Sequence, residues 1–229
     1  MKGWSFGVTA GNDLTMLKSV IDSIRNEVKG FENYEILIVG DQNKILDFAA
    51  EDVRLIGFNE SIKSGWITRK KNLIAQQSKF DKISMHHDYV SLMNGWYQNF
   101  ERFGDDWDVA MTRIENKDGS RFRDWVTWID GAGENVIQFL RYDDNTDTSR
   151  MYVSGSYFCV KKEFMLAYPF NENLVWGQGE DAEWSKSIRN FWNYKINFYS
   201  KVKTLKMKHK WPPDDPFEEW FINNMREKI

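Results

Sequence analysis

The sequence predicts an α/β protein with a doubly wound, mostly parallel central sheet flanked by helices. Two continuous apolar runs, at residues 4–11 ("WSFGVTAG") and 34–42 ("YEILIVGDQ"), are typical of strands buried on both faces of a parallel sheet. Between them, residues 12–30 place apolar side chains at alternating spacings of three and four, the period of an amphipathic helix. Strands that alternate with helices imply right-handed crossovers, and such sheets bind ligands outside the carboxyl ends of their strands.

The remaining segments continue this alternation. In the first helix, Asn12 or Asp13 is available as the N-cap, and Gly30 as the stop. Further strands are expected at 53–58, 81–87, 107–115, 151–160 and 194–200, and further helices at 67–80, 91–103, after "GQGED" (177–181) and at 216–227. Neither a repeat nor a low-complexity linker interrupts the chain, so we expect one compact domain over residues 1–229.

Composition excludes several classes of function. The net charge of −3 and pI near 5.7 give no general basic footprint, so we expect no nucleic acid partner. A single cysteine, Cys159, can form neither an internal disulfide nor a Cys-based zinc cluster, and we expect it in a buried strand. The N-terminal residues lack a long apolar stretch, which predicts no secretory signal, no transmembrane segment and a cytoplasmic location.

The segment "KISMHHDYV" (82–90) places two of the three histidines beside Asp88 at the end of a predicted strand. An aspartate at that position is a candidate ligand for a divalent metal, although it could instead cap a helix beginning near Ser91. The third histidine, His209, could join it where strand ends meet, or could simply lie on the surface. A mixed imidazole and carboxylate site suits Mn²⁺ or a similar cation better than Ca²⁺.

Two further segments carry charged side chains near predicted helix starts. Arg69, Lys70 and Lys71 fall in one helical turn, where at least one could reach a phosphate or all could be solvated. Glu180 and Asp181 follow "WGQG", where acids commonly offset the helix dipole. A carboxylate held there beside aromatic side chains could instead accept a proton from a sugar hydroxyl.

Taken in order, six segments resemble the nucleotide-diphospho-sugar glycosyltransferases of the GT-A fold. They are "FGVTAG", "EILIVGDQ", "TRKKNLIAQQ", "SMHHDYV", "WGQGED" and "KMKHKW". The resemblance covers roughly residues 4–211 and is strongest to the inverting family 2 and galactosyltransferase-like members. It implies a donor-binding half at about residues 1–90 and an acceptor and catalytic half at about 91–211.

The resemblance also implies roles for individual residues. The nucleotide pocket would involve Thr9, Gly11, Asp41, Lys70, Lys71 and His86. Asp41 would contact the base or ribose, and His86 stands where the family usually has an acid facing the ribose. Asp88 would bind the metal that bridges the diphosphate, and His209 would complete the metal shell.

On the acceptor side, the resemblance implies that Asp181 is the general base and Glu180 an acceptor-binding acid. The acceptor-side wall would include Gly155 and Ser156. Because the domain is short, the acceptor would either be small or lie across an open groove rimmed by Trp125, Trp128 and Trp176. The partners implied are a nucleotide-sugar donor and a carbohydrate or other hydroxyl acceptor. Mn²⁺ is the favoured metal, with Mg²⁺ as the alternative.

The function predicted on this basis is inverting transfer of a sugar, from a UDP-sugar in preference to a GDP-sugar, to a hydroxyl acceptor with metal assistance. The alternative is a catalytically silent nucleotide- or carbohydrate-binding module, which the replacement of an acid by His86 favours. A nucleotidyltransferase is a third interpretation and ranks last. It would need a glycine-rich basic loop after the first strand, and "TAGNDLTM" contains neither Lys nor Arg.

Overall fold

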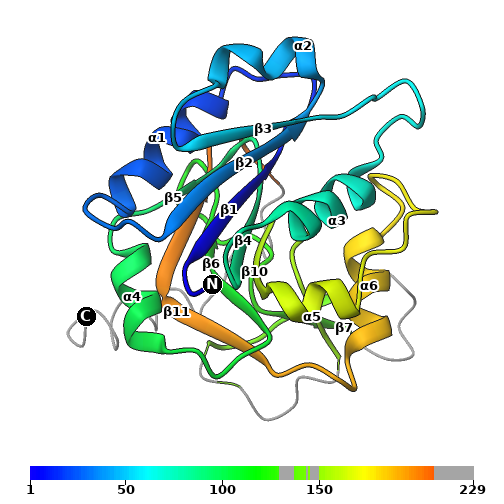
Figure 1. The fold of residues 1–229 in the computed structure, drawn as a ribbon. Helices are drawn as coiled ribbons and strands as arrows, with labels where there is room; N and C mark the ends of the chain where they lie inside the picture. The colour runs from blue at the N-terminus through cyan, green and yellow to red at the C-terminus, as the bar shows by residue number, and fades with distance from the viewer. Residues whose placement is uncertain (129–136, 143, 145–149, 209–229) are drawn as a thin grey trace.

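The computed structural model describes residues 1–128, 137–142, 144 and 150–208 (Figure 1). Within these residues, eight strands form a central sheet in the order β3-β2-β1-β4-β10-β6-β11-β5. Their bounds are β1 (Trp4–Thr9), β2 (Tyr34–Gly40), β3 (Val53–Gly57), β4 (Lys82–His87), β5 (Val90–Leu92), β6 (Val109–Glu115), β10 (Tyr157–Lys161) and β11 (Tyr194–Thr204). A small second sheet has the order β8-β7-β9, with β7 (Val126–Trp128), β8 (Ile137–Phe139) and β9 (Met151–Tyr152).

Strand direction divides the central sheet. β1, β2, β3 and β4 are mutually parallel, as are β6 and β11, whereas β10 inserts antiparallel between β4 and β6. β5 adds an antiparallel edge on β11. The register places Thr9 at the end of β1 beside His87 at the end of β4. The predicted class, a mostly parallel sheet flanked by helices, is confirmed.

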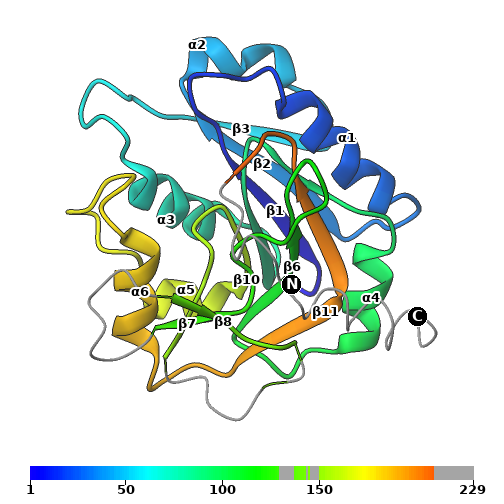
Figure 2. The ribbon, with the colours of Figure 1, turned by 180° about the vertical axis from the view of Figure 1, so that it is seen from behind.

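Helices cover the sheet from both sides. Their bounds are α1 (Leu17–Glu27), α2 (Gln42–Ile45), the 3₁₀ turn η1 (Leu46–Phe48), α3 (Ile67–Gln77), α4 (Trp96–Phe103), α5 (Lys162–Ala167) and α6 (Glu180–Ile188). α1 packs near β5 and α4 along β11, whereas α3 packs on β1, β2 and α5. Figures 1 and 2 show α1 and α4 on one side of the sheet and α3, α5 and α6 on the other.

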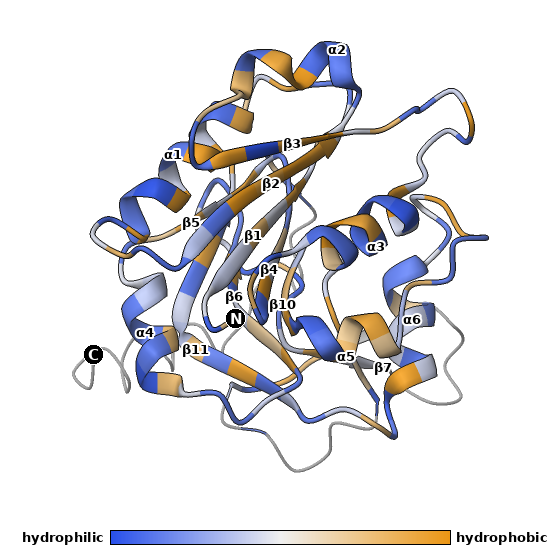
Figure 3. Cartoon of the chain, in the orientation of Figure 1, coloured by the Kyte–Doolittle hydropathy of each residue, from blue (hydrophilic) through white to orange (hydrophobic). Residues whose placement is uncertain are grey.

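The core lies along the inner strands, whose apolar residues stand out in Figure 3. All six residues of β1 are buried, as an inner strand of a covered parallel sheet requires. Trp4 packs edge-on against Trp96 at a ring-centroid distance of 4.9 Å and against Phe100 at 5.1 Å. Burial of large aromatic rings is a major source of stability, so these contacts fix α4 against the sheet.

Two helix starts differ from the sequence prediction. α1 begins at Leu17 because Asp13 accepts hydrogen bonds from the backbone and hydroxyl of Thr15 and holds a turn there. The helix predicted from residue 91 begins at Trp96, since Val90–Leu92 pair with β11 and Gly95 adopts φ 83°. Asp88 is therefore not the cap of that helix.

Among the described residues, no helix is both long enough and apolar enough to cross a membrane. The helix predicted at 216–227 lies outside the described residues. Cys159 is fully buried in β10, as expected, and burial raises the pKa of its thiol to about 12.

Candidate active site

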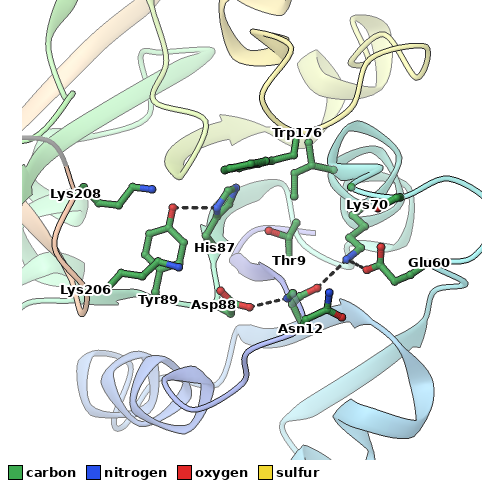
Figure 4. Close-up of a pocket in the computed structure, with 15 residues that line it drawn as sticks. Thr9, Asn12, Glu60, Lys70, His87, Asp88, Tyr89, Trp176, Lys206 and Lys208 are labelled. Carbon is green, nitrogen blue, oxygen red and sulfur yellow. Dashed lines mark hydrogen bonds and ion pairs between the residues drawn. The ribbon is translucent and has the colours of Figure 1, made fainter.

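The carboxyl ends of β1 and β4 border a cavity of about 340 Å³, which we call the donor cavity (Figure 4). Parallel pairing of these two strands brings their last residues to one edge of the sheet. The polar residues that line it include Thr9, Asn12, Glu60, Lys70, His87, Asp88, Tyr89, Lys206 and Lys208. The sequence prediction of a ligand site at this edge placed Thr9, Gly11, Lys70 and Asp88 there, and all four line the cavity.

Asp88 links the carboxyl ends of β1 and β4 by a hydrogen bond. Its Oδ2 accepts a hydrogen bond from the backbone N–H of Gly11 at 2.6 Å. Burial raises the pKa of the Asp88 carboxyl, while the Gly11 bond and the charges of Lys206 and Lys70 act in the opposite direction. A Cβ at position 11 would lie 3.3 Å from Oδ2, so glycine permits this close approach.

The two histidines of β4 have different environments. His86 is fully buried, and its ring nitrogens contact Ser84 Oγ at 2.8 Å and the Val90 carbonyl at 3.1 Å. Burial lowers its pKa to about 4. His86, which the resemblance places toward the ribose, lines neither this cavity nor the one beside it. His87, and not His86, lines the donor cavity.

The two lysines assigned to the nucleotide pocket, Lys70 and Lys71, have different surroundings. The Nζ of Lys70 lines the donor cavity, donates to the Ala10 carbonyl at 2.7 Å and pairs with Glu60. Lys71 is fully buried on the other side of α3, with Nζ 3.8 Å from Glu180 Oε1. Lys71 therefore does not line the donor cavity but lies beside Glu180.

Asp41 and Trp125 also lie away from the donor cavity. Asp41 lines a neighbouring hollow, and its side chain caps α2 by accepting a hydrogen bond from Asn43 N at 3.0 Å. Trp125 is fully buried and stacks on Tyr194 at 5.1 Å, so it rims no groove. The side chain of Trp128 lies outside what the structure describes, whereas Trp176 lines both the donor cavity and the second cavity described below.

A second cavity of about 410 Å³, the acceptor-side cavity, adjoins the first. The two share a wall made of His87, Tyr89, Trp176 and Lys208. The acceptor-side cavity also contains Gly155 and Ser156, as predicted, together with Arg123, Glu180 and Asp181. A ligand that passes this wall would therefore meet the charged end of one cavity and the carboxylates of the other.

The carboxylates at the start of α6 are held in different ways. Asp181 Oδ2 accepts from Gly155 N at 2.9 Å, and Oδ1 accepts from Ala182 N at 2.9 Å. Glu180 is 6% exposed, and burial raises its pKa while the nearby Lys71 charge lowers it. Each carboxylate oxygen of Asp181 keeps a further lone pair, so this side chain is oriented and still able to accept a proton.

Gly155 offers a test of how closely Asp181 must be placed. A Cβ at position 155 would lie 2.8 Å from Asp181 Oδ2, closer than any normal contact. If Asp181 is the base that the resemblance implies, Gly155→Ala should displace the carboxylate and lower the reaction rate by about 10- to 100-fold, because small misplacements of reacting groups are costly. Transfer rate, donor affinity and Tm measured together check this. An unchanged rate would show that the position of Asp181 does not matter.

The metal site implied by the resemblance is not complete in the described residues. Asp88 is in place, but His209 lies outside them. Among the residues that the structure describes, no three His, Cys, Asp or Glu side chains are grouped so that they could hold a metal ion. The cavity instead presents Lys70, Lys206 and Lys208, whose charges oppose a divalent cation. These side chains do not fit a resident metal.

Sequence reasoning missed several cavity residues. His87 and Tyr89 flank Asp88 in the segment "KISMHHDYV", but the sequence pattern does not indicate which of them faces a ligand. Lys206 and Lys208 alternate in "KMKHKW", and this spacing at the end of a strand is the signal that could have identified them. Glu60 lies in a loop without any recognisable motif.

The architecture is that of the nucleotide-diphospho-sugar transferases, the GT-A fold. One solved structure with this arrangement is GalNAc-T7 with UDP, GalNAc and Mn²⁺, with a TM-score of 0.68 and 12% identity over 96% of this chain and 47% of that one. Another is S. aureus TarS, residues 1–349, with a TM-score of 0.60 and 14% identity over 89% of this chain and 60% of that one.

This likeness confirms the predicted fold. The chain spans about half the length of the first structure and three-fifths of the second. No protein-family model matches the sequence, and a search of curated proteins found no match. Membership of family 2 or of the galactosyltransferase-like group therefore stays a prediction.

Proposed function

We propose that the protein is a glycosyltransferase that moves a sugar from a nucleotide-diphosphate donor, UDP-sugar in preference to GDP-sugar, to a hydroxyl acceptor. The observation that carries the proposal is the shared wall between two cavities. Cationic side chains lie on one side of it and the carboxylates Glu180 and Asp181 on the other. The ligands of the GalNAc-T7 structure, UDP and GalNAc, support a donor of this class.

In this proposal the donor lies along the sheet edge. Its diphosphate faces Lys206, Lys208 and His87, and its nucleoside extends toward the hollow lined by Asp41, which shares Asn12 and Glu60 with the donor cavity. The sugar reaches the shared wall, where the indole of Trp176 is 65% exposed and offers a flat apolar surface. The acceptor enters the second cavity.

The reaction follows from this placement. Asp181 takes the proton of the acceptor hydroxyl as its oxygen attacks the anomeric carbon. The bond between that carbon and the diphosphate oxygen breaks on the opposite face, so the nucleoside diphosphate leaves with the bonding electron pair and the configuration inverts. Positive side chains in the donor cavity stabilise the charge that develops on the leaving group.

A second candidate is a binding module that holds the nucleotide sugar without transferring it. The observation in its favour is that both oxygens of Asp181 already accept backbone hydrogen bonds, as a purely structural carboxylate would. This candidate and the enzyme predict the same donor binding. They differ in turnover.

The first test is therefore binding. At about 100 times its dissociation constant, a UDP-sugar should add about 2.7 kcal/mol to the free energy of unfolding, and this is seen as a rise in Tm. Free sugars without a nucleotide serve as the control and should leave Tm unchanged. If no UDP- or GDP-sugar raises Tm or gives heat in calorimetry, both the enzyme and the binding module are wrong.

A further inference from the structure

The donor cavity is lined by three lysines and two carboxylates, which leaves one positive charge in excess. Lys206 and Lys208 flank Tyr89, with their Nζ atoms 4.0 Å and 5.1 Å from its ring centroid. In the part of the chain that the structure describes, no carboxylate lies within ion-pair distance of either lysine. Lys70, on the far side of the cavity in Figure 4, is already paired with Glu60.

A buried hydrogen-bond donor in His87 also favours an anion in this cavity. His87 is more than nine-tenths buried, its Nδ1 contacts the Tyr89 hydroxyl at 3.2 Å, and its Nε2 has no hydrogen-bond partner. If Tyr89 donates to Nδ1, the proton of the neutral ring lies on Nε2. A buried N–H without a partner costs free energy that an acceptor from a ligand would recover.

Further positive side chains lie close to this group. Lys208 lines both cavities, with Lys206 in the donor cavity and Arg123 in the acceptor-side cavity. Like charges gathered in a partly closed cavity destabilise the protein unless an anion joins them.

We propose that Lys206, Lys208 and His87 hold the diphosphate of the donor directly, so that nucleotide binding does not require a divalent metal. This rests on the proposed function and names the chemistry of its donor site. Two ammonium groups supply the charge compensation that a metal usually gives, and His87 supplies a neutral donor. Asp88 then acts as the link between β1 and β4 through Gly11, not as a metal ligand.

The test is calorimetry on the full chain with three probes: UDP, inorganic pyrophosphate and uridine. Each is titrated once with Mn²⁺ and once with excess chelator. We expect UDP and pyrophosphate to bind with affinities that differ less than about threefold between the two buffers, and to weaken with added salt. Loss of UDP and pyrophosphate binding in chelator, with binding restored by Mn²⁺, would overturn the lysine site and leave the proposed function standing.

Variants make the assignment specific. Lys206→Met with Lys208→Met should weaken UDP and pyrophosphate about 10- to 100-fold, since charge-assisted hydrogen bonds are lost. Lys29→Met with Lys79→Met removes the same charge from exposed positions that do not line the cavity, and should change affinity little. Equal effects of the two pairs would overturn the proposal. Pyrophosphate binding without any nucleoside diphosphate binding would support the lysine site and refute the proposed function.

Discussion

Asp181→Asn is expected to leave donor binding intact and to lower the rate of sugar transfer by about 10²- to 10⁴-fold. The substitution keeps the size of the side chain and its acceptor oxygen toward Gly155 N, but an amide cannot take the proton of the acceptor hydroxyl. Single-turnover transfer from a UDP-sugar, donor affinity by calorimetry and Tm are the three measurements.

A structural role of Asp181 predicts a different pattern. If the carboxylate only offsets the dipole of α6, its loss costs about 0.3–1 kcal/mol of stability and leaves turnover almost normal. Glu183→Gln is the matched control, because Glu183 is in the same first turn but lines neither cavity. Transfer by Asp181→Asn at a rate close to that of the control would refute the assignment of Asp181 as the base. Donor binding by the wild type without any transfer would favour the binding module.

The sequence allowed the fold and the sheet edge of the site to be predicted for a physical reason. Apolar runs closed by Gly11 and Asp41 mark strand ends, and parallel strands bring their carboxyl ends to one edge. Asp88 follows from this geometry, whereas Thr9 was implied by the resemblance. The position of Asp181 at a helix start, after glycines with positive φ, was likewise visible in "WGQGED".

The orientation of side chains could not be predicted in the same way. His86 and His87 both lie in a strand buried on both faces, so alternation of polar and apolar residues gives no sign of which faces a ligand. Lys70 and Lys71 belong to a helix buried against the sheet and against α5, and so each of them is buried. Only the long-range contacts with Glu60 and Glu180 separate their roles.

The pair formed by Lys71 and Glu180 leads to the second large effect. Lys71 Nζ is fully buried over the ring of Phe170 at 4.8 Å, and the structure gives it no hydrogen-bond partner. Its compensation is the Glu180 carboxylate at 3.8 Å. Because a buried charge that loses its partner is costly, Lys71→Met should lower the free energy of unfolding at neutral pH by about 3–5 kcal/mol.

Two comparisons separate the lost ion pair from a packing defect. Lys71→Met with Glu180→Gln removes both charges from apolar surroundings and should recover most of the stability. Lys79→Met, at an exposed position, should leave stability unchanged. If the double variant is as unstable as Lys71→Met alone, the loss comes from packing around Phe170.

The pH dependence of this loss has a definite sign. Burial raises the pKa of Glu180 above its ordinary value of 4.5, and the Lys71 charge opposes the rise, so Lys71→Met raises that pKa further. A carboxyl whose pKa is higher in the folded state than in the unfolded state destabilises the fold as pH rises above 4.5, because the unfolded state loses the proton first. Below that pH the carboxyl is protonated and neutral in both the folded and the unfolded state. The difference in stability between the wild type and Lys71→Met should therefore be largest near pH 7 and shrink as pH falls through this range. Denaturant unfolding at several pH values measures it, and a difference that grows toward low pH would contradict the assignment of Glu180 as the partner of Lys71.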